Sequence, residues 1–408
     1  MNFLQFFIWG SWLLTIGAYW FQTRQWSGTE FGAIFSTMGI ASLFMPAITG
    51  IIADRWINAE KLYGVFHIIG AILLSILPLI NDPDTFFWVI LLTMIFYMPT
   101  IALAITVAYT AMKNRGMDIV KDYPPIRVWG TVGFIMALWV ISLSDLETSP
   151  AQFYVAAAAS LSLGLYAFTL PKCPPLNSGH KKSLTEALGL NAFKLFRSTK
   201  MALFFIFAML LGASLQLTNA YGDTFLHDFA DIPAYKELIA VKYPAIIMSI
   251  SQISETLFIL TIPFFLKRFG IKKVMLMSMV AWILRFGLFG YGNPADGLWM
   301  IVLSCIIYGM AFDFFNISGS LFVETQSDPA IRASAQGLFM MMTNGFGAFL
   351  GSRLSGIIID NFFVLDGGAF DWKGIWLTFA AYSLVVAVLF AVFFKHKHDP
   401  HAVSQLHH

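Results

Sequence analysis

The sequence is poor in charge. Asp, Glu, Lys and Arg make up only 12% of its 408 residues, about half of their share in a typical soluble domain. Hydrophobic residues make up 58%, and apolar stretches long enough to cross a bilayer recur from end to end. This composition excludes a soluble globular domain and indicates an all-α polytopic membrane protein. The net charge of +2 by itself says nothing about nucleic acid, because the placement of the charges matters more; we expect no nucleic-acid partner.

Cysteines and catalytic motifs are scarce as well. Cys173 falls in an expected inner loop and Cys305 inside an expected helix, so no disulfide framework is implied. No HExxH, GxSxG or Cys/His constellation occurs, and we therefore expect neither an enzyme nor a bound metal. No expected loop exceeds roughly thirty residues, whereas a receptor usually carries a sizeable soluble domain.

Hydropathy and turn residues predict twelve membrane spans in two six-helix halves. Breakers such as Pro124-Pro125 and Ser149-Pro150 fall between spans. The halves are residues 1–170 and 200–395, separated by a cytoplasmic loop at 171–199 and followed by a cytoplasmic tail at 396–408. The expected spans are 3–22, 29–53, 61–80, 86–112, 126–144, 151–170, 200–222, 241–266, 273–292, 297–324, 333–360 and 374–394.

Lys and Arg orient these spans. With both termini inside, eighteen of them fall in inner segments and four in outer loops, while Arg127, Arg285 and Arg353 remain in or at the edge of spans. Such an excess on one side predicts a cytoplasmic N-terminus and C-terminus. Arg285 is expected to pair with neighbouring carbonyls or to snorkel towards the surface.

Two carboxylic acids lie deep inside apolar spans. Glu255 is in SISQISETLFIL and Asp313 is in YGMAFDFFNISG. An acid at the centre of a membrane helix costs about 2.5–3.5 kcal/mol on insertion scales, so it is a functional hypothesis by default. An acid that binds a proton in one access state and releases it in another would couple transport to protons.

Other polar side chains repeat at helical spacing near these acids. They form stripes on the expected fifth, seventh, eighth and tenth spans, and such stripes should line a wet cavity or pair with one another. Scattered Ser and Thr residues, by contrast, commonly join helices. The stripes are Arg127, Thr131 and Phe134; Gln216 and Asn219; Gln252 and Glu255; and Tyr308, Phe312, Asp313, Asn316 and Ser320.

The chemistry of the stripes suits a hydroxylated or heteroaromatic solute. Carboxamides present a donor beside an acceptor, as the edge of a nucleobase does, and aromatic rings offer stacking faces. An arginine or a carboxylate binds vicinal hydroxyls. A sugar site would draw on the same residues, so composition leaves two alternatives open: a proton-coupled nucleoside transporter, and a proton-coupled permease for sugars or other hydroxylated solutes.

Two isolated histidines are weaker candidates for a functional role. His67 lies in the third span, where a lone histidine is more often packed and hydrogen-bonded than functional. His227 is expected to be solvated in an outer loop.

The loop after the second span carries a signature. Gly50, Asp54 and Arg55 resemble the G-x-x-x-D-R loop of the major facilitator superfamily, a gating and conformational element; the alternative is an ordinary charged turn. In that superfamily two six-span halves build a central site at the bilayer midplane.

Longer blocks are similar to the bacterial nucleoside:proton symporter family within that superfamily. The resemblance covers essentially the whole chain. The blocks are FLQFFIWGSW (Phe3–Trp12), GIASLFMPA (Gly39–Ala47), GMDIVKDYPPIRVWGTVGFIMA (Gly116–Ala137), DTFLH (Asp223–His227), SISQISETLFILTIPFFL (Ser249–Leu266), AFDFFNISGS (Ala311–Ser320), and ASAQG with MMTNGFG (between Ala333 and Gly347).

The resemblance implies a function and a site. It implies import of nucleosides such as uridine and adenosine with protons, across the bacterial inner membrane, by a chain sufficient as a monomer and without a cofactor. Asp313 would carry the proton, and Glu255 would bind the ribose and take part in proton coupling, with Arg127 as counter-charge unless it lies at the inner surface. The nucleoside would be held by Arg127, Thr131, Phe134, Gln216, Asn219, Gln252, Glu255, Tyr308 and Phe312.

Overall fold

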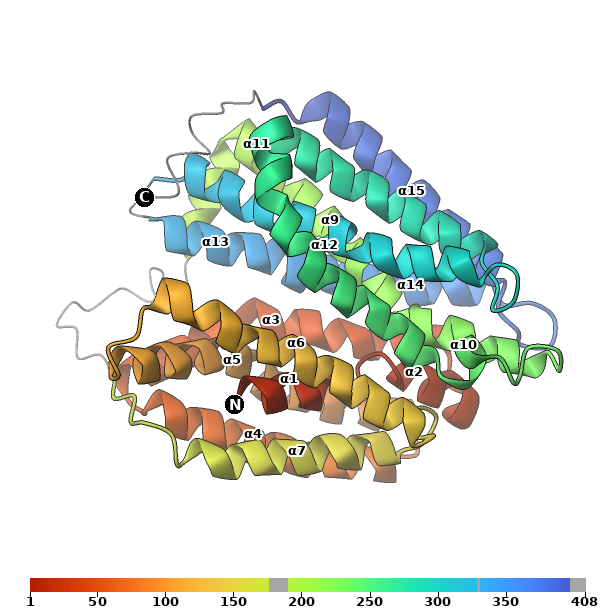
Figure 1. Cartoon of the computed structure of the whole chain (residues 1–408), viewed down its shortest axis with the longest axis horizontal. Coiled ribbons are helices and arrows are strands. Elements are labelled where there is room, and N and C mark those ends of the chain that lie inside the picture. The colour runs from red at the N-terminus through yellow and green to blue at the C-terminus, as the bar shows by residue number, and fades with distance from the viewer. Residues whose placement is uncertain (176–189, 329–330, 397–408) are drawn as a thin grey trace. The chain divides into compact units, whose positions relative to one another are not determined.

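The computed structural model describes residues 1–175, 190–328 and 331–396 (Figure 1). Contacts along the chain divide it into two compact units, Met1–Leu188 and Gly189–His408. Helices dominate both units, and one isolated β-bridge joins Val364 and Phe370 within the described residues. Most of the expected tail at 396–408, and residues 176–189 of the expected loop, lie outside the described residues; residues 190–197 of that loop form a 3-10 helix, η3.

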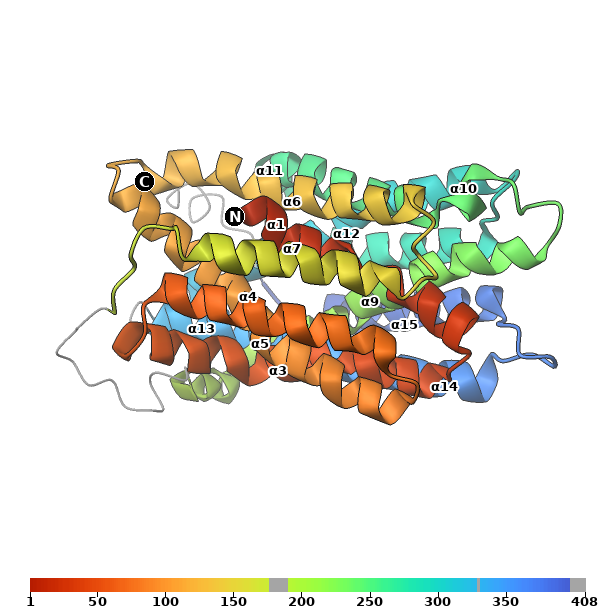
Figure 2. The same cartoon turned by 90° about the horizontal axis from the view of Figure 1, so that it is seen from below.

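The N-terminal unit is a bundle of long helices. In it α1 packs on α6, α3 on α5 and α4 on both α5 and α7, and Figures 1 and 2 show α4 and α7 side by side. Asp82 caps α5 by accepting from the amide of Thr85, and Pro83 occupies its first turn, where no amide donor is needed. The helices are α1 (Asn2–Gly10), α2 (Ile16–Ala18), η1 (Tyr19–Arg24), α3 (Gly28–Arg55), α4 (Ala59–Ile76), η2 (Leu77–Leu79), α5 (Pro83–Lys113), α6 (Ile119–Leu143) and α7 (Ala151–Ala167).

The first expected span is not one continuous helix. It consists of α1, a turn, the short α2 and the π-helix η1. In η1 the Nε of Arg24 donates to the hydroxyl of Tyr19 at 2.6 Å, a pairing across the five-residue repeat of a π-helix. A carbon added at Gly10 would lie 2.6 Å from the carbonyl oxygen of Phe134, so α1 and α6 touch at backbone level there.

The prediction that Pro124-Pro125 precedes the fifth span is wrong. The helix α6 begins at Ile119 and contains both prolines. They lie within its first two turns, so the hydrogen bonds they remove belong to the end of the helix rather than to its middle. Arg127 therefore lies within α6 instead of at its start.

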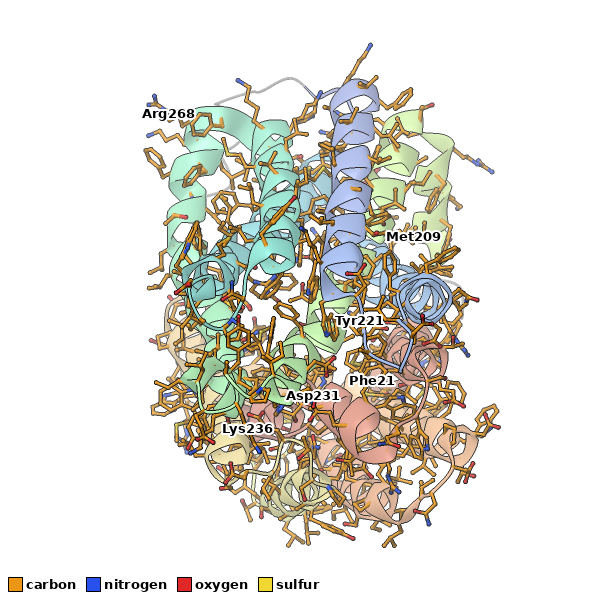
Figure 3. The ribbon with its side chains drawn as sticks, turned by 90° about the vertical axis from the view of Figure 1, so that its right-hand side faces the viewer. Phe21, Met209, Tyr221, Asp231, Lys236 and Arg268 are labelled. Atoms are coloured by element: carbon orange, nitrogen blue, oxygen red, sulfur yellow. The ribbon has the colours of Figure 1, made fainter. Side chains whose placement is uncertain are left out.

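The described residues of the C-terminal unit are also mostly helical, with loops and one isolated bridge between the helices. Figure 3 shows α9 passing through Met209 and Tyr221, followed by the segment that ends at Asp231. The helices are η3 (Leu190–Arg197), α9 (Thr199–His227), η4 (Asp228–Asp231), α10 (Ile239–Lys242), α11 (Pro244–Tyr291), α12 (Leu298–Gln326), α13 (Arg332–Met340), η6 (Met341–Gly347), α14 (Ala348–Phe362) and α15 (Trp372–Phe393).

Two irregularities shape this unit. Gly270 has φ 76° and ψ 166° and divides α11 into two helices at the expected basic turn. The π-helix η6 joins α13 to α14, and it packs on α9 so closely that a carbon at Gly212 would lie 2.1 Å from the carbonyl oxygen of Thr343. Isolated π segments inside helices often mark functional sites.

Eight of the helices among the described residues are long and apolar enough to cross a membrane. A helix of 20 residues spans about 30 Å, the thickness of the hydrocarbon core. The protein is thus an all-helical chain with several membrane-length helices.

Candidate substrate and proton site

Three candidates of the N-terminal unit share one face of α6. The guanidinium of Arg127 lies 4.2 Å from the ring centre of Phe6 on α1, a cation–π contact. Thr131 is half-buried and Phe134 is 8% exposed. Gly133, on a different face of α6, packs against α1, since a carbon added there would meet the carbonyl oxygen of Phe3.

A buried polar network underlies α1. The amide nitrogen of Gln5 donates to Thr100 Oγ1 at 2.8 Å, while its Oε1 accepts from the hydroxyl of Tyr63 at 2.7 Å and lies 2.9 Å from Nε2 of His67. Because Thr100 already donates to the carbonyl of Tyr97, its oxygen must be the acceptor, which fixes the orientation of the Gln5 amide.

The same network fixes the tautomer of His67. An amide oxygen only accepts, so Nε2 of His67 must carry a proton and donate to Gln5. Nδ1 faces the hydroxyl of Ser160 at 3.3 Å. The prediction of a packed, hydrogen-bonded histidine is confirmed; the central role of Gln5 was missed because a single polar residue in an apolar helix has no periodic signal.

The signature residues lie at the end of α3. Gly50 is half-buried, Asp54 and Arg55 are exposed, and a carbon added at Gly50 would meet nothing within 4 Å. The acid that is buried nearby is Glu60, 3% exposed, which the sequence reasoning did not single out. It accepts from the amide of Cys173 at 2.8 Å, and burial raises the pKa of the Cys173 thiol.

In the C-terminal unit, α9 contributes two carboxamides. Gln216 is 7% exposed, and its Oε1 accepts no hydrogen bond within the described part of the chain. Asn219, one turn later, is half-buried.

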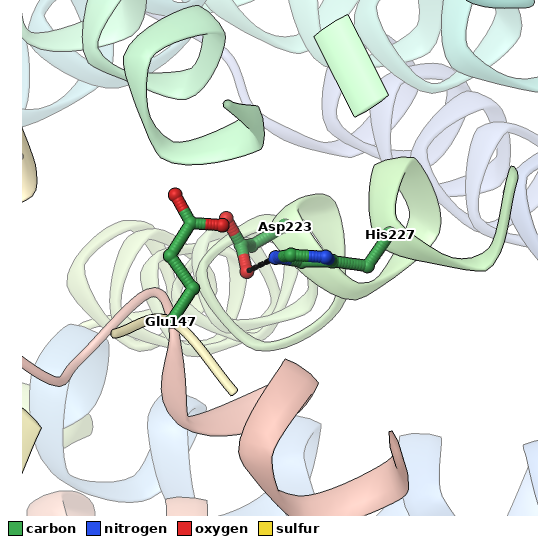
Figure 4. Close-up of side chains that lie close together, drawn as sticks. All are labelled: Glu147, Asp223 and His227. Atoms are coloured by element: carbon green, nitrogen blue, oxygen red, sulfur yellow. Dashed lines mark ion pairs between the residues drawn. The ribbon is translucent and has the colours of Figure 1, made fainter. Parts of the chain in front are cut away.

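The prediction that His227 is solvated in a loop is wrong. The helix α9 extends to this residue, and its side chain lies half-buried, 3.6 Å from the carboxylate of Asp223 one turn earlier (Figure 4). Spacing of four residues on a continuous helix brings the two side chains onto one face.

The remaining candidates lie on α11 and α12. The rings of Tyr308 and Phe312 are stacked, with centres 5.8 Å apart and planes within 4°. A carbon added at Gly309 would lie 2.8 Å from the backbone nitrogen of Glu255, so the two helices are in backbone contact beside that acid. Glu255 and Asp313 are close enough for their charges to repel one another.

The acid at Asp313 is enclosed. It is 4% exposed, and its Oδ2 has no hydrogen-bond partner among the described residues. Oε1 of Gln252, one turn before Glu255, is likewise buried without a donor in the part of the chain described. Buried acceptors in this condition are costly unless a ligand, water or proton supplies a donor.

Two other side chains of the tenth-span stripe are already hydrogen-bonded within the protein. The amide of Asn316 donates to the carbonyl of Phe312 at 3.0 Å, and Ser320 donates to Gln336 on α13 at 3.1 Å. The first bond stays within α12, whereas the second joins α12 to α13, the helix-joining role common for polar residues in membrane helices.

Arg285 is more deeply buried and more fully hydrogen-bonded than the sequence predicted. It is 0% exposed, and its Nη1 donates to the carbonyl of Ser304 at 2.7 Å, so pairing with a carbonyl is confirmed and snorkelling is wrong. Its Nε donates to Thr218 at 3.3 Å, and its cation lies 4.6 Å from the ring centre of Tyr308. Within the described residues no carboxylate pairs with it.

A small cavity lies inside the C-terminal unit. Its lining includes Leu215, Trp282, Phe312, Asn316 and Thr343. The space of about 20 Å³ accommodates one water molecule and is too small for a nucleoside.

Comparison with known proteins adds to this geometry. Residues 1–399 match the family model described as nucleoside H⁺ symporter. Nucleoside permease NupG of Escherichia coli is 54% identical over 399 residues, covering 98% of this chain and 95% of that protein. Xanthosine permease of the same organism is 54% identical over 405 residues, covering 99% and 96%. The crystal structure of the nucleoside transporter NupG superposes with a TM-score of 0.92, covering 97% of this chain and 98% of that one.

Proposed function

Because the chain belongs to the nucleoside H⁺ symporter family, we propose that it imports ribonucleosides such as uridine and adenosine together with protons. Transport would proceed by alternating access across the bacterial inner membrane, with the proton as coupling ion and no cofactor. One chain would suffice as the functional unit.

The proposed topology has twelve spans with both termini inside. Support comes from the eight membrane-length helices, one of which, α11, is divided at Gly270. Three further spans would be made of shorter pieces: α1 to η1, α7, and α13 to α14. The excess of Lys and Arg in the inner segments supports the orientation.

The observation that carries the proposal is a set of buried acceptors beside stacked rings. Gln216 Oε1, Gln252 Oε1 and Asp313 Oδ2 lie on three helices of the C-terminal unit, each without a donor among the described residues. Tyr308 and Phe312 present an aromatic pair on the helix that carries Asp313. Nucleoside hydroxyls and base amino groups are donors, and a base is a planar stacking partner.

Each candidate receives a role on this basis. Asp313 would carry the proton because it is the enclosed acid, and Glu255, half-buried at the Gly309 contact, would bind the ribose. The loop of Gly50, Asp54 and Arg55 would act in the conformational change. The other proposed nucleoside contacts are Arg127, Thr131, Phe134, Gln216, Asn219, Gln252, Tyr308 and Phe312.

The test is uridine uptake into proteoliposomes that contain the purified protein, with and without an inward proton gradient. We expect accumulation that collapses with a protonophore, and no accumulation with Asp313→Asn. Uptake of free ribose, with none of uridine or adenosine, would contradict the proposal and favour a sugar permease. Uptake that is indifferent to the protonophore would remove the proton from the mechanism.

A further inference from the structure

Four basic side chains converge on one pocket of the C-terminal unit. Lys200 comes from the start of α9, Lys272 from the second helix of α11, and Lys395 and His396 from the segment after α15. These residues, the basic pocket, line an open depression of about 580 Å³, within the size range of small-molecule sites. Among the described residues that line it, none is a carboxylate.

Hydrogen bonds hold the basic pocket in shape. The ammonium of Lys200 donates to Oε1 of Gln326 at 2.7 Å, and that of Lys272 donates to the carbonyl of Ala391 at 3.0 Å. The ring of His396 lies 5.4 Å from that of Phe322 on α12. Among the residues described, none of the three lysines has a carboxylate within ion-pair distance, so their charges are not neutralised locally.

Apolar surface adjoins the pocket. On the last turns of α15, just before Lys395, the exposed side chains include Val388, Leu389, Val392 and Phe393, of which Val392 is 59% and Phe393 57% exposed. A free inorganic anion has no apolar part that could contact such a surface. A lipid would, because its acyl chains need an apolar path that begins where its phosphate is bound.

We propose that the basic pocket binds the phosphate of an anionic phospholipid whose acyl chains lie along α15. Basic pockets between membrane helices are suited to anionic headgroups, and each lysine near the surface strengthens the attraction by roughly fivefold. Figure 3 shows Arg268, in the turn of α11, at the same end of the unit as the last turn of α15. The proposal rests on the proposed membrane topology, and not on which solute is transported.

The test is native mass spectrometry of the full chain in detergent, titrated with phosphatidylglycerol or with phosphatidylcholine. The first variant combines Lys200→Gln, Lys272→Gln and Lys395→Gln. The matched control combines Lys267→Gln, Arg268→Gln and Lys273→Gln, three exposed cations of the α11 turn that do not line the pocket. Thermal unfolding and uridine uptake are measured on both, so that a lipid result is read separately from a transport result.

We expect tight retention of one phosphatidylglycerol by the wild type, weakened by at least tenfold and up to roughly a hundredfold in the first variant. The control should stay within about twofold. Equal loss in the control would reveal a diffuse field instead of a site, and equal binding of phosphatidylcholine would remove the requirement for an anionic lipid. Displacement of the lipid by millimolar inorganic phosphate would reassign the pocket to a free anion. If the first variant does not fold, Lys395→Gln, at an exposed position, should still weaken retention about fivefold.

Discussion

Gly309 provides a measurable link between helix packing and the candidate site. A carbon added there would lie 2.6 Å from the carbonyl oxygen of Ser254 and 2.8 Å from the backbone nitrogen of Glu255. These are backbone atoms, so no side chain can turn away to make room. Relieving the shorter contact to an ordinary 3.4 Å requires α11 and α12 to separate by about 0.8 Å.

Gly309→Ala should therefore cost about 1–3 kcal/mol through overpacking. The separation also exceeds the roughly 0.5 Å within which a binding constellation must be held, and it moves Glu255 away from the Tyr308–Phe312 pair. We expect uridine affinity to fall at least tenfold, measured by equilibrium binding to purified protein, together with a lower unfolding temperature.

Gly287→Ala is the matched control. This glycine lies in α11, the helix that Gly309 of α12 contacts, and an added carbon there meets nothing within 4 Å. Alanine should be neutral or stabilise this helix by about 0.4–1 kcal/mol. If Gly309→Ala bound uridine and unfolded as the control does, the close contact would not govern the site and the reasoning would be refuted.

Substitutions at three further positions each address a single role. Asp313→Asn should abolish uptake driven by a pH gradient while sparing nucleoside binding, and loss of both together in counterflow and binding assays would count against a pure proton role. Phe134→Ala should weaken binding by about 1–3 kcal/mol if the ring stacks on the base; unchanged affinity would assign the ring, 8% exposed, to packing against α1. Arg285→Met should lower the unfolding temperature, because a charge-assisted bond contributes about 1.5–3 kcal/mol, and Arg285→Lys should recover part of the loss; equal stability of the three proteins would show that the bond to Ser304 contributes nothing.

Periodicity located most of the long helices, because an apolar stretch bounded by turn residues carries its own signal. The prediction failed where packing between distant segments decides the backbone. The first span breaks after Gly10, where α1 meets the backbone of α6, and no pattern within residues 3–22 reports that meeting. Pro124 and Pro125 were interpreted as breakers, although prolines in the first turns of a helix disturb only its end.

The family was predicted from whole-chain blocks, and this prediction is confirmed by the match over residues 1–399 and by the relatives at 54% identity. The site residues themselves stay predictions. Spacing alone places Arg127 and Phe134 on one face of α6, but it does not tell which neighbour that face meets. The contact of Arg127 with Phe6 joins residues that are far apart in sequence, so it is visible only in the fold.

The Gln5 network of the N-terminal unit and the acceptors around Asp313 in the C-terminal unit differ in how fully they are hydrogen-bonded. In the N-terminal unit both polar ends of Gln5 are used, by Thr100, Tyr63 and His67, so its network needs nothing from outside. In the C-terminal unit Asp313 Oδ2 and Gln252 Oε1 have no donor among the described residues. A satisfied network rigidifies a bundle, whereas an unsatisfied one is stabilised by whatever donor arrives. A proton or a nucleoside hydroxyl that reaches Asp313 or Gln252 would therefore stabilise these groups more than it would the Gln5 network. It would drive a change of state only if this stabilisation differs between the two access states.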